Sequence, residues 1–324
     1  MAFKPPAAVV LLGAQRFEPS LGAALQNLRV TGRIALITAG WQERELEDEE
    51  LSAHLGGDTI NLRLHARGEE IFKKDTELRT AHRERQDALR HHQDFYRIRL
   101  EHLVAADNVM EKRAAPPLIA AEEAKTSVEA LRELDNRHLA RCARLHSEFE
   151  ERWSLATRPS VALHRKEIAE TVQGCGAIAI SGGHVASLLN RLMLFGIGEL
   201  VEDRLLFAWS AGAMALSERV VLFHDDPPQG PGVSEVLDAG LGLVPGVIVL
   251  PQPEQRLRLD RRDRLRALVS RFAPAACLAL PACSRVTWRA GKLSAPVGVV
   301  ELRGDGSTGV FDPSAAAPLE ARAP

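Results

Sequence analysis

The stretch LLFAWSAGA at residues 205–213 decides the fold of this chain, because an apolar run leads without a break into a serine and then into small residues. A short apolar run of this kind is typical of a buried strand in a parallel sheet, and the small residues after Ser210 open a short helix. A second apolar run, residues 177–180, ends one helix upstream in the turn Ser181-Gly182-Gly183-His184. Because loops at the carboxyl ends of parallel strands converge, the two turns are predicted to lie together in an α/β core.

The same alternation of strands and helices extends outward from this pair. Before residue 66 the pattern is βαβαβ, and it resumes after Arg158 with a helix over 163–173. The sequence therefore predicts an α/β fold: an open, mostly parallel sheet with helices on both faces, interrupted by a long α-helical hairpin insertion. The predicted parts are a core of residues 1–66 and 159–303, an insertion of 67–158 and a loose tail of 304–324. Further predicted strands are 7–13, 33–40, 59–64, 220–223 and 247–250, with an antiparallel pair formed by 286–292 and 297–302.

The insertion differs sharply in composition from the core. Charged residues and histidines crowd residues 67–158, and Pro116-Pro117 is its one strong break, which predicts two long helices joined by a turn. In the second helix, apolar residues and the polar Asp135 and His138 share one seam at spacings of three and four residues. An arm of roughly 40 residues would extend about 60 Å and project well beyond a compact domain. We expect its seam to be covered by itself, by a second copy (a homo-oligomer) or by a protein partner. The apolar seam residues are Val128, Leu131, Cys142, Leu145 and Phe149.

Composition excludes several classes of function. The chain has 324 residues, 45% hydrophobic and 26% charged, with a formal net charge of -2, which is the balance of a soluble protein. This charge gives no reason to expect nucleic acid or a membrane surface as partner. The first residues form no signal-peptide pattern, so a cytoplasmic location is expected. The four cysteines form no CxxC pair, and we expect no disulfide, metal or cofactor.

The residues around Ser210 form the pattern of a nucleophile elbow. Such a turn exposes the serine Oγ above the sheet, and small neighbours such as Ala208 and Gly212 avoid a clash with it. Backbone N–H groups of Gly183 and Ala211 would stabilise an oxyanion formed beside Ser210. Together the elbow and the upstream glycine turn resemble the serine peptidase family of dipeptidase E and cyanophycinase, a branch of the class I glutamine amidotransferase-like fold. The resemblance covers most of residues 7–65 and 160–302 and does not cover the insertion.

This resemblance implies a role for particular positions. Ser210 matches the family nucleophile, and Gly183 with Ala211 matches the oxyanion hole. The position of the catalytic histidine is held by Gln252 and that of its supporting acid by Ala282, neither of which can do that work. Glutamine amidotransferases themselves use a cysteine where this chain has Ser210.

Other residues complete the predicted site. His184 and His224 are the two candidates for a substitute base, and each has the alternative interpretation of an ordinary loop residue. His224-Asp225-Asp226 is interpreted as a polar turn before Pro227-Pro228, with a pocket wall or a cation site as the alternative. Predicted binding residues are Gly182, Trp209, Asp225 and Gln252.

Two hypotheses from different classes follow. In the first, the chain is a catalytically impaired member of this hydrolase family that keeps a pocket for a small peptide or amide and uses its helical arm for assembly. In the second, it is an active peptidase or amidase that uses Ser210 with a relocated base.

Overall fold

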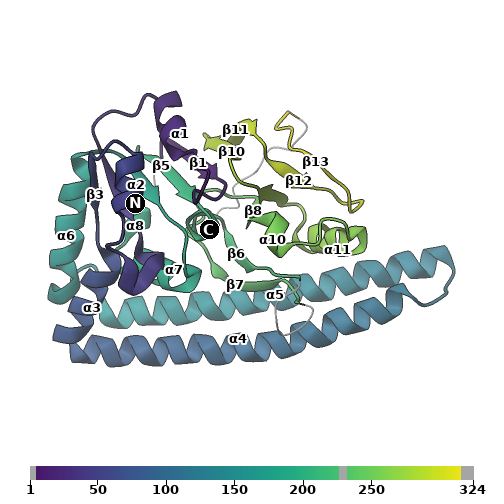
Figure 1. Ribbon diagram of the computed structural model, residues 1–324. Helices are drawn as coiled ribbons and strands as arrows, with labels where there is room; N and C mark the ends of the chain where they lie inside the picture. Colours follow the sequence, from purple (N-terminus) through teal and green to yellow (C-terminus); the bar gives the residue numbers. More distant parts are fainter. Residues whose placement is uncertain (1–4, 226–231, 315–324) are drawn as a thin grey trace.

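The core is a seven-stranded sheet with the strand order β11-β10-β1-β5-β4-β2-β3. The computed structural model describes residues 5–225 and 232–314. Strands β1, β5, β4, β2 and β3 are parallel, and β10 and β11 extend the sheet with antiparallel pairing. The fold class predicted from the sequence is confirmed (Figure 1). The strands of this sheet are β1 (Ala8–Leu12), β2 (Arg33–Ile37), β3 (Thr59–Asn61), β4 (Cys175–Ile180), β5 (Leu205–Trp209), β10 (Arg285–Arg289) and β11 (Lys292–Val297).

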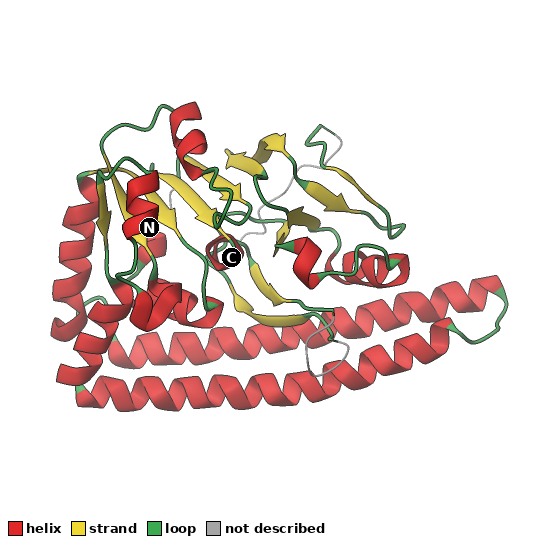
Figure 2. Ribbon diagram, viewed as in Figure 1, coloured by secondary structure: helices red, strands yellow, loops and turns green. Residues whose placement is uncertain are grey.

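Helices cover both faces of the sheet, which explains why its central strands are apolar along their whole length (Figure 2). In β1, Val9 and Leu11 belong to one buried cluster, whereas Val10 and Leu12 belong to the other. The second cluster packs under α1 (Leu21–Asn27) and α2 (Glu49–His54), which follow β1 and the 3₁₀ helix η1 (Ala39–Arg44). The first packs under α3 (Leu64–Lys74), α6 (Pro159–Gln173), α7 (Val185–Leu194), α8 (Ile197–Leu200) and α9 (Ala211–Leu216).

Two smaller sheets complete the core and correct two predictions. Strands β6 (Arg219–Leu222) and β7 (Glu235–Ala239) pair with each other, and the order β13-β12-β9-β8 forms a four-stranded sheet. The predicted pairing of 286–292 with 297–302 is wrong: β10 pairs with β11, because Ala290 and Gly291 both have positive φ and close a two-residue hairpin between them. The predicted loose tail is also wrong up to residue 314, because β13 pairs with β12 and Phe311 is buried, whereas 315–324 lies outside the described residues. The remaining elements are β8 (Val247–Pro251), α10 (Pro253–Arg256), α11 (Arg262–Phe272), β9 (Ala276–Leu280), β12 (Val300–Leu302) and β13 (Thr308–Val310).

The insertion is a hairpin of two long helices, α4 (Thr76–Glu111) and α5 (Pro117–Trp153), as the sequence predicts. Its two ends are tied together by Asp75, which caps α4 by accepting from Leu78 N at 3.1 Å. The same carboxylate accepts from Arg158 at 2.5 and 2.7 Å and from Ser160 Oγ at 2.6 Å. This ion pair holds the pKa of Asp75 well below its usual range. The hairpin is therefore anchored where it leaves the core.

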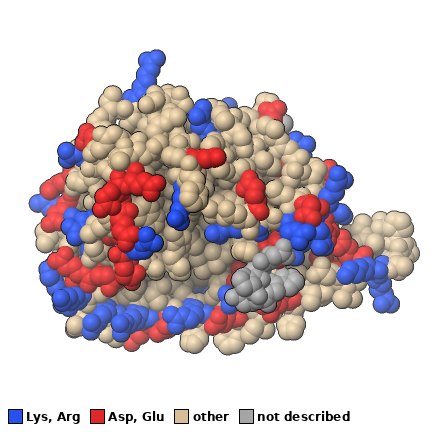
Figure 3. Space-filling view, viewed as in Figure 1, with Lys and Arg blue, Asp and Glu red and all other residues tan. Residues whose placement is uncertain are grey.

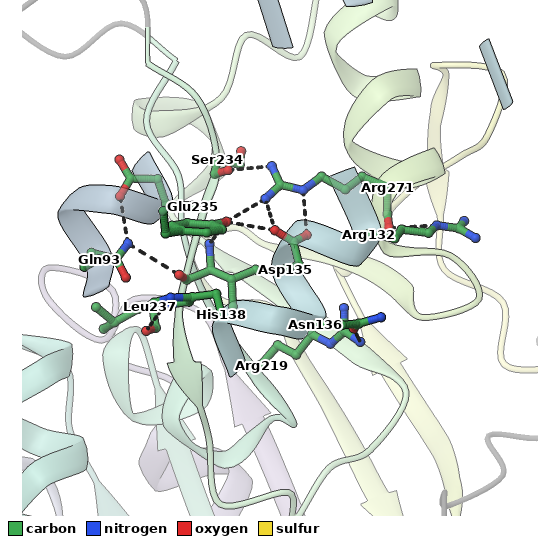
Figure 4. Close-up of polar contacts among 12 residues, drawn as sticks. Gln93, Arg132, Asp135, Asn136, His138, Arg219, Ser234, Glu235, Leu237 and Arg271 are labelled. Atoms are coloured by element: carbon green, nitrogen blue, oxygen red, sulfur yellow. Dashed lines mark hydrogen bonds and ion pairs between the residues drawn. The ribbon is translucent and has the colours of Figure 1, made fainter. Parts of the chain in front are cut away.

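Most of the hairpin lies along the core rather than projecting from it, which corrects the prediction of a free arm (Figure 1). The seam polar residues make the contact: Asp135, fully buried, accepts from Arg271 of α11 at 2.6 and 2.8 Å and from Tyr96 Oη at 2.8 Å (Figure 4). Tyr96 Oη also accepts from Val236 N of β7 at 3.0 Å. His138 stacks on the Tyr96 ring and contacts the carbonyl oxygen of Leu237 at 3.1 Å. The seam is thus covered by the chain itself, through α4 together with β7 and α11.

Candidate functional site

Ser210 occupies a strained turn between β5 and α9. Its backbone has φ 50° and ψ -123°, a region that residues other than glycine rarely adopt, and the strain is imposed by the buried elements on both sides. Gly212 explains the small-residue pattern, because a Cβ there would lie 2.4 Å from the carbonyl oxygen of Ile180. The structure therefore has a strained strand-to-helix turn at Ser210, and the role of this turn as a nucleophile elbow stays a prediction.

The upstream glycine turn packs directly against this elbow. A Cβ on Gly182 would lie 2.7 Å from Ser210 Cβ, so the two turns approach as closely as backbone allows. Gly183 has φ +110°, and a Cβ there would lie 2.3 Å from the carbonyl oxygen of Gly40. Gly183 and Ala211 both line the cavity beside Ser210, and the backbone N–H of Gly183 has no backbone acceptor among the described residues. Their role as an oxyanion hole stays a prediction.

A cavity of about 620 Å³ opens beside Ser210, within the size range of sites for small ligands. Predicted residues Gly182, Trp209 and Gln252 all line it. Figure 3 shows basic and acidic side chains on both sides of a hollow in the region between α2 and α10. The charged and polar side chains of the wall come from loops and helices that follow β1, β2 and β8, and they are Gln15, Arg16, Arg44, Glu47, Glu50, His54 and Arg256.

Gln252 lies at the cavity at the end of β8, in the left-handed conformation with φ 54° and ψ 52°. Its backbone N–H donates to the carbonyl oxygen of Leu280, so the position is fixed by the pairing of β8 with β9. Ala282 lies in the exposed turn after β9 and does not line the cavity. Among the described residues, no side chain hydrogen bonds to Ser210 Oγ.

His184 has a structural task elsewhere. Its Nδ1 accepts from Ser187 N at 3.2 Å and lies 2.9 Å from Ser187 Oγ, so its ring caps the N-terminus of α7. It is exposed and does not line the cavity. Because His184 lies outside the cavity lining, its ring is not placed beside Ser210 in this structure.

His224 and Asp225 lie beyond β6 and also stay outside the cavity lining. Asp225 is buried and accepts from Arg258 N at 2.7 Å and from Arg264 at 2.8 Å. This carboxylate therefore orders the chain before α11 rather than facing a ligand. The predicted neighbours Asp226 and Pro227-Pro228 lie outside the described residues.

The charged wall of the cavity was missed by the sequence reasoning. His54 is the one histidine of the lining, at the end of α2, and its Nε2 accepts from Gly22 N at 3.2 Å. Arg44 pairs with Glu47 at 2.6 Å and holds the pKa of that carboxyl below its usual range. No motif marks these residues. The one available signal is that each follows the carboxyl end of a parallel strand, where loops converge.

The described residues also bear on two other classes of site. No group of three or more His, Cys, Asp or Glu side chains there could hold a metal ion. No described helix is long and apolar enough to cross a membrane.

The solved structures that resemble this chain include two proteins described as peptidases, both of low sequence identity. No family model and no curated protein matches the chain. A peptidase from an acI-B1 actinobacterium matches at 14% identity and a TM-score of 0.47, over 95% of this chain and 98% of that one. A proposed peptidase E from Listeria monocytogenes EGD-e matches at 10% identity and a TM-score of 0.44, over 90% of this chain and 100% of that one.

Proposed function

We propose that this chain is a catalytically impaired relative of the dipeptidase E and cyanophycinase hydrolases that binds a small peptide or amide beside Ser210 without cleaving it. One observation carries the proposal: the elbow and the glycine turn share a cavity with Gln252, and no described side chain can take the Ser210 proton through a hydrogen bond. A serine hydroxyl without a base is a poor nucleophile, and loss of one triad member costs several orders of magnitude in rate.

The charges of the wall favour a small ligand that carries both signs. Because Arg44 is paired with Glu47, the charged side chains left to bind a ligand are the basic Arg16 and Arg256 and the acidic Glu50. Within the described residues, these three form no ion pair. A peptide with a free carboxylate and a free amine would pair with both kinds of group.

An active serine hydrolase is the second candidate, favoured by the strained elbow, since strain of this kind clusters at reactive sites. The substitute bases predicted from the sequence, His184 and His224, do not line the cavity, whereas His54 does. In this reading His54 would accept the Ser210 proton after a movement of α2.

Covalent labelling separates the two candidates. We expect a fluorophosphonate probe to leave the protein unlabelled, as it leaves Ser210→Ala unlabelled. We expect Gln252→His to gain labelling, because histidine tolerates the left-handed backbone at this position and would bring an imidazole to the cavity. Labelling of the unmodified protein that is lost in both Ser210→Ala and His54→Gln would establish the hydrolase instead.

Calorimetry with a panel of dipeptides tests the pocket independently of catalysis. Arg256→Gln should weaken binding of a dipeptide about tenfold, because one charge-assisted contact to the carboxylate is lost. Arg289→Gln is the matched control, an exposed arginine on β10 that does not line the cavity. Equal affinities for both variants, or no affinity for any member of the panel in the unmodified protein, would contradict the proposed ligand class.

A further inference from the structure

The end of the helical hairpin, residues 105–126, is the part of the insertion that the core leaves uncovered, and we call it the distal tip. From residue 105 to residue 126 every residue except Asp107 is exposed, whereas burial begins again at Leu100 on α4 and Ser127 on α5. Figure 1 shows this tip extending past α11. Large apolar side chains face solvent there: Val109 is 69%, Leu118 82% and Ile119 51% exposed.

A pair of helices by itself buries only one seam. Elsewhere along the hairpin, β7 and α11 cover a second side of the helix pair, whereas at the distal tip every residue from 105 to 126 except Asp107 stays exposed. The tip is rich in alanine, which lets helices approach closely, with Ala105 and Ala106 on α4 and Ala120, Ala121 and Ala124 on α5. Two such pairs packed together would enclose the shared core of a four-helix bundle.

The charges of the distal tip are arranged so that the surface complements itself. Lys112 and Arg113 lie in the turn, and Glu122 and Glu123 lie on α5 roughly 8 Å further along the helix axis. None of the four forms an ion pair with a described residue, whereas the nearby Lys125 pairs with Glu129 on its own helix. A twofold axis between two antiparallel tips would place each basic turn beside the acidic pair of the other copy.

We propose that the distal tip binds the distal tip of a second copy of this chain, as an antiparallel four-helix bundle with twofold symmetry. The interface has an apolar centre formed by Val109, Leu118 and Ile119 and two symmetric sets of charge pairs at its ends. The proximal hairpin, which the core covers, has no part in it.

Charge reversal tests the partner's identity. Lys112→Glu with Arg113→Glu makes the tip wholly acidic at these positions, and Glu122→Lys with Glu123→Lys makes it wholly basic. Each double variant alone should dimerise at least about tenfold more weakly than the unmodified protein in analytical ultracentrifugation. Mixed together they should form a heterodimer, because each basic surface then meets an acidic one. Dimers that persist in both variants alone, or a mixture that stays monomeric, would overturn the proposal.

Apolar substitution gives a second measurement. Leu118→Glu should convert the dimer to a monomer, and Leu163→Glu, at a 59% exposed leucine on α6, should leave it intact. An unmodified protein that is monomeric at every concentration reached would also overturn the proposal and leave the tip to another partner. Peptide binding at the Ser210 cavity should be equal in all these variants, so failure here is distinguishable from failure of the proposed function.

Discussion

The substitution Asp135→Asn tests whether the hairpin is part of the folded core. Asp135 is completely buried and accepts three hydrogen bonds, two from Arg271 and one from Tyr96. Burial raises the pKa of the Tyr96 phenol, so this residue stays a protonated donor at neutral pH. Asparagine keeps the shape but removes the charge, which leaves the Arg271 guanidinium, 5% exposed, without its counter-ion.

An unpaired buried charge sets the size of the effect. Breaking a buried ion pair by removing one partner costs about 3–5 kcal/mol, and we expect a loss of that order in the free energy of unfolding. Asp135→Leu combined with Arg271→Met should cost less than Asp135→Asn alone, because neither charge is then left unpaired. The comparison separates the cost of one unpaired buried charge from the loss of the ion pair itself.

Urea unfolding followed by circular dichroism and tryptophan fluorescence measures these losses. Glu133→Gln is the matched control on the same helix, where an exposed ion pair with Arg137 should contribute less than about 1 kcal/mol. Hydrogen exchange should also speed up across β7, whose Val236 N–H donates to Tyr96 Oη. A loss for Asp135→Asn no larger than that of Glu133→Gln would refute the view that the hairpin and the core fold as one unit.

Three further predictions concern single residues. Burial lowers the pKa of His82 from its usual 6.5 to about 4, so the unfolded chain binds a proton at a higher pH than the folded chain does. The free energy of unfolding should therefore fall by at most about 3 kcal/mol as the pH drops from 6.5 to 4. Thermal melts of His82→Gln should show a smaller fall over this range, and a fall equal to that of the unmodified protein would contradict the prediction. Gly183→Ala should lower the free energy of unfolding by about 2 kcal/mol or more and abolish peptide binding, because the new Cβ would overlap the carbonyl oxygen of Gly40. Unchanged peptide binding by calorimetry would contradict the view that this turn tolerates glycine alone. Ala290→Gly should raise the free energy of unfolding by about 1 kcal/mol, since alanine is strained at φ 47°. A urea midpoint lower than that of the unmodified protein would show that the hairpin turn is not strained.

The strands of the parallel sheet could be predicted because they are buried on both faces. A strand such as β5 must be apolar along its whole length, and this pattern can be recognised in the sequence even when the neighbouring strands are unknown. The edge strands β11 and β13 were missed for the opposite reason. Residues such as Lys292 and Thr308 are exposed, so these strands carry little apolar pattern and depend on pairing with β10 and β12.

The candidate site also has a part that could be predicted from the sequence and a part that could not. The tight turn at Ser210 was predictable because backbone geometry demands small residues at fixed offsets, as at Gly212. The wall of the cavity was not, because Arg16, His54 and Arg256 come from a loop and two helices, α2 and α10, whose convergence requires the sheet to be assembled. Likewise, the role of His184 as a helix cap became clear only from the structure, in which its Nδ1 accepts from Ser187 N.

The sequence by itself determined the local structure of this protein, which consists of the buried strands, the serine turn and the two long helices of the hairpin. Periodicity and small-residue spacing encode these features, since they depend on contacts between residues close in the chain. Only the tertiary structure decided that most of the hairpin lies against the core, because the contact of Asp135 with Arg271 joins helices that are far apart in sequence. The tertiary structure also places Gln252 at the cavity beside Ser210, and it leaves the distal tip exposed.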